Sequence, residues 1–530
     1  MAQTETQFLL LLLVGALVGA LALRWRLPYT VALVVAGIGL GTLHLSQFAS
    51  LHLTPELLMM VFLPALLFEA AFHLKLDDLR RESFVVLWLA VPGVAVAVTV
   101  TALLSWVGVS AIFDPAFSLG NAFLFASMIA ATDPISVLAL FRTLGVTRRL
   151  YLLVEGESLL NDGVAVVVFL IVAAVLGVHV GHAEAPHLEG LGEVVVYAVR
   201  TFAWMAAGGV LVGAAVGAAA SVLTRQVDDK LIETAMTVVV AYGSFLVAEQ
   251  VRASGVLATV TAGLVLGSFG SQFGMSVRTR VAVADFWEFF AFFSNTFVFL
   301  LVGLELDIVA LLSAGGAIAL AFVAVLLGRA ATVYGSLPII RRLAREPVPV
   351  AWGHVMVWGG LRGSLSMVLV IGLPADFPGR SLLVLLVFGV VSISLVLQAL
   401  TMKPLLARLG LVKGAVARVA YETARARTLM AQAALAALDK QRDHLEPNVR
   451  EALLERYAAQ LQDGRAAARS AVGERFDEER MQDATLHLLA VEADALRHAQ
   501  SEGIVGEEAA ESLHTALGEE RERLVHDEGE

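Results

Sequence analysis

The chain has 530 residues, of which 58% are hydrophobic and 16% are charged, with a formal net charge of -11 and a mean hydropathy of +0.78. These values lie far outside the average for soluble domains and are typical of an integral membrane protein. The chain has no cysteine, which excludes disulfides, thiolate metal sites and cysteine nucleophiles, and nothing in its acidic balance favours nucleic-acid binding.

Apolar runs of about 18 or more residues recur along the first four fifths of the chain, and each can cross roughly 30 Å of hydrocarbon as a helix. Because backbone groups in lipid must satisfy one another, these unbroken runs predict an all-α polytopic membrane protein. Gly, Pro and charge clusters delimit thirteen predicted transmembrane helices, near 6–23, 29–45, 54–73, 84–108, 118–141, 151–178, 194–223, 231–250, 254–270, 283–305, 308–336, 350–372 and 381–404.

The loops between these spans are alternately rich and poor in basic residues. Fifteen Lys and Arg residues fall on one side of the predicted membrane, and only Arg252 and Arg380 fall on the other. Because short cytoplasmic loops retain Lys and Arg, we expect the N-terminus outside and the C-terminus in the cytoplasm. The fifteen are Arg24, Arg26, Lys75, Arg80, Arg81, Arg142, Arg148, Arg149, Arg225, Lys230, Arg278, Arg280, Arg341, Arg342 and Arg345.

Thirteen spans divide into six, one linker and six, and an odd linker makes the second six start on the opposite side from the first. This topology is an inverted repeat, which is typical of secondary transporters with midplane sites on interrupted helices. The fifth span of the first half contains Asp133 followed by Pro134, and the fifth of the second half contains the segment Trp358–Gly363 with Arg362. Each therefore combines a helix breaker with a charge.

Ionisable groups deep in membrane helices cost about 3 kcal/mol or more, so they usually mark an ion path or a structural pair. Within 155–163, residues four apart share a helix face. Ser158 and Asp162 are thus predicted to point the same way, and Glu157 and Asn161 to form a neighbouring stripe. The intramembrane ionisable set is Glu69, Asp133, Glu155, Glu157, Asp162 and Arg362.

We predict that Asp162 and Ser158, with Asp133 and the Thr132 backbone freed by Pro134, offer oxygen ligands to a partly dehydrated Na+. A buried carboxylate can hold either a cation or a proton, since either neutralises it. If the site changes sides only when occupied, this competition alone yields exchange. The alternative for the two Asp residues is a buried hydrogen-bond anchor.

Glu157 is predicted to pair with Arg362 across helices, as a structural salt bridge whose loss would strand a buried charge. Glu69 is predicted to be either an outer ion ligand or gate, or a polar lock between helices. Arg329 is expected to snorkel or to pair.

The composition changes near Val412. The segment 412–530 holds 24 Asp plus Glu against 15 Lys plus Arg, and parts of it have helical apolar spacing. We predict a membrane domain at 1–411 and a cytoplasmic acidic helical tail at 412–530. A solvated appendage or dimerisation aid is the favoured role of the tail, ahead of a regulatory one.

Five sequence strings occur in the order found in one transporter family. They are FEAAF from Phe68, ATDPISV from Ala131, EGESLLNDG from Glu155, SNTFVFLLVGLEL from Ser294 and WGGLRGSLS from Trp358. Residues 5–410 thereby resemble the bacterial NhaP-like Na+/H+ antiporters of the first monovalent cation:proton antiporter family. The tail lies outside the region of this resemblance.

The resemblance implies a homodimer in a bacterial inner membrane, with a core bundle that moves like an elevator and a site where two discontinuous helices cross. It implies ion and proton binding at Asp162, with Asp133, Ser158 and Thr132 as co-ligands and Glu69 nearby. Asn161 marks the electroneutral branch, which exchanges one Na+ or Li+ per proton. The pairing of Glu157 with Arg362 is implied as well.

Three other classes of membrane protein share some of these features. A K+/H+ or broad-specificity antiporter would use the same oxygens. An intramembrane aspartyl protease also has two membrane Asp residues, but its usual Tyr-Asp and Gly-x-Gly-Asp contexts are absent around Asp133 and Asp162. An ion channel is less consistent with two inverted halves, because that topology is typical of alternating-access transporters. We therefore expect a secondary transporter rather than an enzyme, with no cofactor beyond the transported ions.

Overall fold

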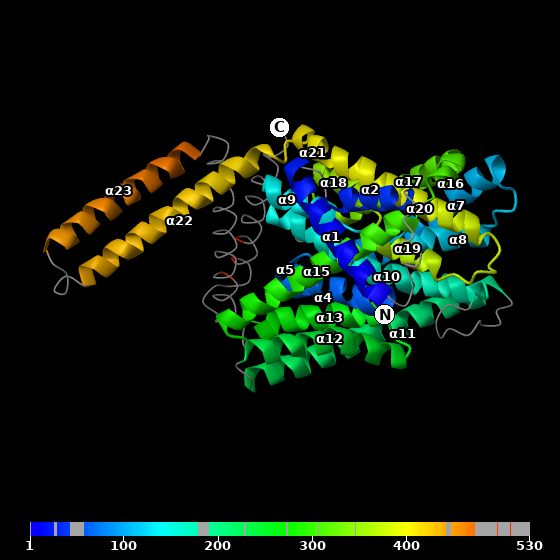
Figure 1. The fold of residues 1–530 in the computed structure, drawn as a ribbon, viewed down its shortest axis with the longest axis horizontal. Helices are drawn as coiled ribbons and strands as arrows, with labels where there is room; N and C mark the ends of the chain where they lie inside the picture. Colours follow the sequence, from blue (N-terminus) through cyan, green and yellow to red (C-terminus); the bar gives the residue numbers. More distant parts are fainter. Residues whose placement is uncertain are drawn as a thin grey trace. The chain divides into compact units, whose positions relative to one another are not determined.

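The computed structural model describes residues 2–25, 29–42, 58–178, 190–226, 229–271, 274–305, 307–344, 346–440 and 447–471, with Leu496, Ala509 and Leu513. Arg26, Arg345 and most of the predicted tail beyond residue 471 lie outside the described residues. Within these ranges all regular secondary structure is helical, as predicted (Figure 1).

The helices are given in chain order. The first half comprises α1 (Ala2–Trp25), α2 (Tyr29–Thr42), the π-helical turn η1 (Leu58–Phe62), α4 (Leu63–His73), α5 (Leu76–Arg81), α6 (Ser83–Ala90), α7 (Pro92–Ile112), α8 (Leu119–Met128), α9 (Ile135–Leu144), α10 (Arg148–Val175) and α11 (Leu191–Leu223). The second half comprises η2 (Thr224–Gln226), α12 (Lys230–Gln250), α13 (Gly255–Val265), the π-helical turn η3 (Leu266–Gly270), α15 (Val277–Glu305), α16 (Ile308–Ser313), α17 (Gly315–Leu343), α18 (Val350–Trp358), α19 (Ser364–Ile371), α20 (Arg380–Ile393), the π-helical turn η4 (Ser394–Gln398), α21 (Ala399–Arg408), α22 (Lys413–Lys440) and α23 (Pro447–Ala471).

Seven helical stretches are long and apolar enough to cross a membrane. They are Ser83–Ile112, Arg148–Val175, Gly192–Gln226, Lys230–Gln250, Arg278–Leu304, Gly315–Leu343 and Arg380–Arg408. The predicted span at 6–23 lies within the continuous helix α1, and each of the other remaining predicted spans contains helix in shorter or interrupted pieces. The count of thirteen crossings therefore stays a prediction.

The span predicted at 308–336 differs from the structure. Asp307 Oδ1 accepts hydrogen bonds from Val309 N and Ala310 N at 2.9 and 3.1 Å, which starts the separate short helix α16. The long helix α17 begins only at Gly315 and continues through Pro338 to Leu343. Pro338 does not end it, because proline in a membrane helix is tolerated where neighbouring groups satisfy the freed carbonyl.

The helices before residue 409 pack in two groups. Group 1 contains α1, α2, α4, α11, α12, α13 and α15, and group 2 contains α6 to α10 and α17 to α21. The buried core of group 1 includes Trp287, whose ring centroid lies 4.7 Å from that of Phe68 and whose Nε1 donates to Thr237 Oγ1 at 2.9 Å. The groups meet where α10 packs on α11 and α13, and where α15 packs on α19.

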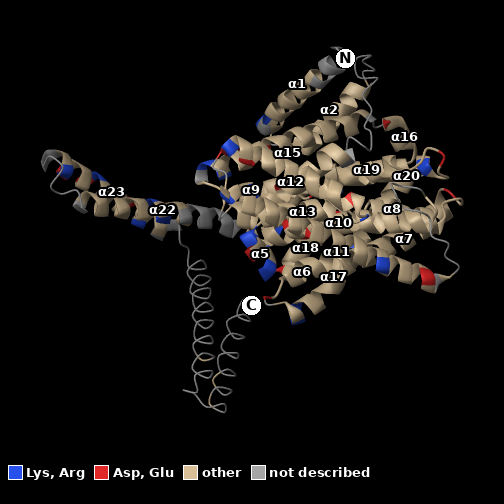
Figure 2. Cartoon of the chain, turned by 90° about the horizontal axis from the view of Figure 1, so that it is seen from below, with Lys and Arg blue, Asp and Glu red and all other residues tan. Residues whose placement is uncertain are grey.

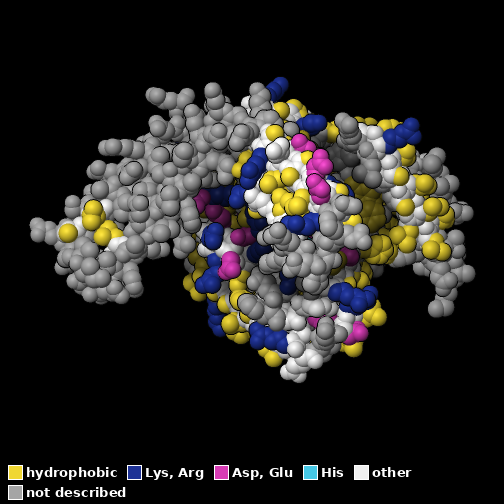
Figure 3. Space-filling view, turned by 90° about the vertical axis from the view of Figure 1, so that its left-hand side faces the viewer, with side chains coloured by type: hydrophobic (Ala, Val, Ile, Leu, Met, Phe, Trp, Pro, Cys, Tyr) yellow, Lys and Arg dark blue, Asp and Glu magenta, His cyan; other side chains and the backbone are white. Residues whose placement is uncertain are grey.

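We call Met1–Leu409 the membrane unit. Most charged residues of this unit lie near helix ends, and the helices are otherwise mostly uncharged along their length (Figure 2). Arg148 Nη2 donates to Asp78 Oδ2 at 2.6 Å, and Arg149 donates to Glu82 at 2.6 Å and to the Glu346 carbonyl at 3.0 Å. These contacts bring three of the predicted basic loops to the same end. Figure 3 shows many Lys and Arg side chains on one face of the molecule.

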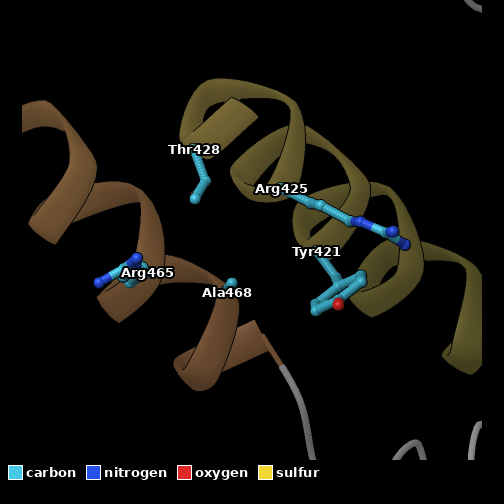
Figure 4. A pocket seen from close by; sticks show the side chains of 5 residues that line it. All are labelled: Tyr421, Arg425, Thr428, Arg465 and Ala468. Atoms are coloured by element: carbon cyan, nitrogen blue, oxygen red, sulfur yellow. The ribbon is translucent and has the colours of Figure 1, made fainter. Parts of the chain in front are cut away.

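The second compact unit is Gly410–Glu530, which begins two residues before the predicted boundary. In its described part, α22 and α23 pack side by side. A pocket of about 340 Å³ lies between them (Figure 4). Its lining residues are Tyr421, Arg425 and Thr428 from α22 and Arg465 and Ala468 from α23. The role of this unit stays a prediction.

Candidate functional site

A first helix break separates α8 from α9 at residues 129–134, where the sequence predicts one. Pro134 lacks an N–H group and disfavours helical geometry in the residue before it. Asp133 Oδ1 accepts a hydrogen bond from Ile135 N at 3.0 Å, which satisfies one of the free N–H groups at the start of α9. The break leaves the backbone of 130–132 available to side chains from α10.

Asp162 and Ser158 on α10 both face Thr132, as their spacing predicts. Thr132 N donates to Asp162 Oδ1 at 3.1 Å. Ser158 Oγ donates to the Thr132 carbonyl and accepts from Thr132 Oγ1 at 3.2 Å. One turn of α10 thereby presents a carboxylate and a hydroxyl to the N–H, the carbonyl and the hydroxyl of Thr132.

Asn161, on the neighbouring face of α10, forms hydrogen bonds to the same helix break. Its Nδ2 donates to the Ala130 carbonyl and to Thr132 Oγ1, each at 3.0 Å, and the side chain is buried. A carboxylate has no N–H groups to offer these two acceptors. The amide is therefore suited to hold the unwound backbone without adding a charge.

A second break separates α18 from α19 at residues 359–363, and the two breaks touch. Asp133 N donates to the Leu361 carbonyl at 2.8 Å. A Cβ atom on Gly363 would lie 2.4 Å from Asp133 Cβ, a distance that forces one of the two segments to shift. Glycine is thus required for the unwound segments to cross this closely.

Glu157 pairs with Arg329 of α17, so the predicted pairing of Glu157 with Arg362 is wrong. Arg329 Nη1 and Nη2 donate to the two carboxylate oxygens at 2.7 and 2.8 Å, and the side chains are only 7% and 3% exposed. Arg362 Nη1 instead donates to the carbonyls of Ala130 at 2.8 Å and Ala131 at 3.3 Å.

The groups that lie near each arginine explain the observed pairing. Carbonyl groups at the end of α8 have no partner within the helix and carry partial negative charge, so they attract the guanidinium that the second break carries. Arg329 lies well inside α17, where a lone intramembrane charge needs a carboxylate. The position of Arg329 as a lone charge within an apolar helix was the sequence signal that could have indicated its pairing with Glu157.

Glu69 does not join these residues in any described contact. Its carboxylate lies on α4, 3.3 Å from His73 Nδ1, and is partly exposed. It interacts electrostatically with Arg142 in the last turn of α9 and with Glu155 near the start of α10. Its predicted role as an ion ligand or gate stays untested, and the position between helix groups also suits a polar lock.

Five ionisable side chains cluster at the crossing and interact electrostatically. Asp133, Glu157 and Asp162 supply three negative charges when ionised, while Arg329 and Arg362 supply two positive ones. One negative charge is left uncompensated in a cluster whose other members, Glu157, Arg329 and Arg362, are buried, and an unpaired charge in such a place is costly. A single proton or monovalent cation would neutralise the cluster.

Comparison with known proteins gives the family. The sequence profile described as sodium/hydrogen exchanger, transmembrane, matches residues 9–408. The chain belongs to the sodium/hydrogen exchanger family. Members of this family are secondary transporters rather than enzymes.

Two bacterial relatives and one solved structure are similar to this exchanger-family chain. The Na+/H+ antiporter ApNhaP of Aphanothece halophytica is 39% identical over 414 residues, covering 78% of this chain and 76% of its own. The Na+/H+ antiporter NhaG of Bacillus atrophaeus is 34% identical over 527 residues, covering 97% of each chain. The sodium proton antiporter MjNhaP1 of Methanocaldococcus jannaschii has the same fold, with a TM-score of 0.58 and 17% identity over 77% of this chain and 99% of its own.

The family match ends at residue 408, so the predicted tail lies outside it, as expected. The alignment with NhaG extends further and covers nearly the whole chain, including most of the tail segment.

Proposed function

We propose that this protein is a secondary active antiporter that exchanges Na+, and also Li+, for H+. The observation that carries the proposal is the placement of the partly buried Asp162 carboxylate against the unwound backbone at Thr132, beside the buried Ser158 hydroxyl. Carboxylate, carbonyl and hydroxyl oxygens are the donors that hard cations prefer. The relatives named above are called Na+/H+ antiporters.

In the proposed mechanism, Na+ and H+ compete for the Asp162 carboxylate, which holds one or the other at a time. The Thr132 carbonyl, Ser158 and Asp133 would be further ligands of the cation. If an empty, charged site does not change sides, each reorientation carries one ion or the other. Because one charge is uncompensated among the five clustered side chains, one Na+ or one H+ suffices, which supports an electroneutral one-for-one exchange.

The test is proton movement in proteoliposomes that contain the purified protein and a pH-sensitive dye. An imposed Na+ or Li+ gradient should move protons, and an equal K+ gradient should move them at a rate at least about tenfold lower, because oxygens held by packed backbone favour the smaller ions. An imposed membrane voltage should leave the rate unchanged. Equal rates with K+ would favour the broad-specificity alternative, and a voltage effect would rule out electroneutrality.

Alternating access is proposed to occur by an elevator movement of group 2 against group 1. All of the proposed cation ligands lie on α8 to α10 or the breaks of group 2. A side-chain hydrogen bond of 2.6 Å joins Thr30 Oγ1 on α2 to Ser136 Oγ on α9, and therefore crosses between the groups. Relative movement must break this contact.

A disulfide between Thr30→Cys and Ser136→Cys should stop exchange, because it would tie the groups together. The two native oxygens are close enough for a disulfide of about 2.05 Å after small adjustments. The chain has no native cysteine, so no other thiol would compete. Oxidation should reduce Na+-driven proton flux at least about tenfold, and a reductant should restore it.

The matched control ties two helices of group 1. A Cβ atom on Gly15 of α1 would lie 3.6 Å from Thr296 Cβ on α15, which suits a disulfide. The pair Gly15→Cys with Thr296→Cys should exchange normally when oxidised. Full exchange by the oxidised 30–136 pair would refute the movement between groups.

The proposal includes thirteen crossings as two inverted six-helix repeats joined by α11, with the N-terminus outside. The crossing of two breaks in corresponding helices supports the repeat. The joining of three basic loops at one end supports a cytoplasmic position for that end. We further propose a homodimer in a bacterial inner membrane, since exposed apolar residues such as Leu13, Leu211 and Val239 suit lipid or a second copy.

A further inference from the structure

The π-helical turn η4 contacts the second break directly. Arg362 N donates to Ser394 Oγ at 2.9 Å, and Ser394 Oγ donates to Gln398 Oε1 at 2.5 Å. Both η4 side chains are at most 2% exposed. None of the sequence motifs includes these residues, because Ser and Gln are unremarkable in a membrane helix.

The peptide group between Leu361 and Arg362 is shared by the hydrogen bonds of η4 and those of the ion site. The N–H of Arg362 and the carbonyl of Leu361 belong to the same planar unit. The N–H donates to Ser394, and the carbonyl accepts from Asp133 N at 2.8 Å. Any rotation of this peptide that breaks one bond also misaligns the other. A continuous chain of hydrogen bonds thus runs from Gln398 through Ser394 to Asp133.

The same stretch of helix holds the other end of the break. Trp358 Nε1, at the end of α18, donates to Thr401 Oγ1 on α21 at 2.8 Å. The break is therefore attached to η4 and α21 at both ends. Single π-helical turns occur frequently at functional sites, where they alter which side chains face a neighbour.

We propose that Ser394 and Gln398 are positioning residues for the cation site. They hold the peptide between Leu361 and Arg362, and through it the Asp133 backbone, in the orientation that places Asp133 beside the Thr132 and Asp162 ligands. Hydrogen bonds in a low-dielectric interior strengthen one another along a chain, so loss of one weakens the next. This inference rests on the proposed Na+/H+ exchange.

The test is the Na+ dependence of exchange in proteoliposomes with Ser394→Ala. The apparent KM for Na+ should rise about tenfold, which corresponds to one buried hydrogen bond, while the maximal rate changes less than about twofold. Ser394→Thr keeps the hydroxyl and should return the KM to within about twofold of wild type. Gln398→Met removes the final acceptor and should raise the KM about threefold.

The control is Ser392→Ala, two residues earlier on the same helix. Its Oγ is buried and has no hydrogen-bond partner in the described structure, so its removal should leave the KM at the wild-type value. A purely structural role for Ser394 would lower the thermal stability and the amount of folded protein without moving the KM.

Three outcomes decide the inference. A KM for Ser394→Ala equal to that of Ser392→Ala overturns it, and so does a fall in maximal rate at unchanged KM. If Ser394→Ala cannot be purified folded, an unchanged KM in Gln398→Met overturns it instead. A wild-type protein that moves no protons with Na+ would instead sink the proposed function, which separates the two failures.

Discussion

Replacing Asp162 by Asn should abolish Na+-driven proton flux, with a fall of at least about a hundredfold. Asn has nearly the same shape, and its Oδ1 can still accept the bond from Thr132 N, so the fold should persist. It cannot hold a negative charge or take up a proton at physiological pH, and both ligands of the exchange therefore lose their site. Proton flux and radioactive Na+ uptake in proteoliposomes measure the effect.

The control for this variant is Asp376→Asn, which removes a carboxylate from an exposed loop. Its exchange should equal that of wild type. Thermal unfolding of purified Asp162→Asn should show folded protein, which separates a lost site from a lost fold. Exchange by folded Asp162→Asn at more than about a tenth of the wild-type rate would contradict competition at this carboxylate.

Breaking the buried pair should produce the largest loss of stability. Glu157→Gln leaves the Arg329 guanidinium without its carboxylate, and Arg329→Met leaves Glu157 without its cation. Stranding a buried charge costs about 3–5 kcal/mol in the free energy of unfolding. Thermal unfolding in detergent and the yield of folded protein measure it. The double variant should recover much of the loss, because it strands neither charge.

An exposed pair provides the comparison. Asp78→Asn removes the partner of Arg148, whose side chain is 65% exposed, and should cost less than about 1 kcal/mol because solvent screens both charges. The prediction for the buried pair fails if Glu157→Gln is as stable as Asp78→Asn. It also fails if the double variant is less stable than either single one.

Arg362 and Arg329 show that sequence spacing alone does not identify which arginine pairs with a buried carboxylate. Both are lone arginines in apolar helices, and either could pair with Glu157 as far as spacing alone is concerned. The unwinding at 359–363 turns Arg362 toward the carbonyls that end α8, while Arg329 reaches Glu157 from a helix more than 170 positions along the chain. Such long-range pairings depend on which helix faces pack together, which periodicity does not specify.

Ser394 illustrates the same limit for hydrogen bonds. A serine in a membrane helix usually bonds to a carbonyl one turn earlier, and its sequence context gives no sign of another role. Its contact with the Arg362 N–H arises only because the second break frees that N–H and η4 packs beside it.

The sequence by itself determined the helical membrane class, both helix breaks, and the shared face of Ser158 and Asp162, because hydrophobic length, proline and the helical repeat act over a few residues. The family resemblance implied that the breaks cross, and the tertiary structure supplied the contacts through which they do. Only the tertiary structure decided that Glu157 pairs with Arg329 and that Glu69 lies away from Asp162 in the described contacts. The physical reason is that a buried charge or an unwound peptide is satisfied by whichever partner packing brings within hydrogen-bonding distance.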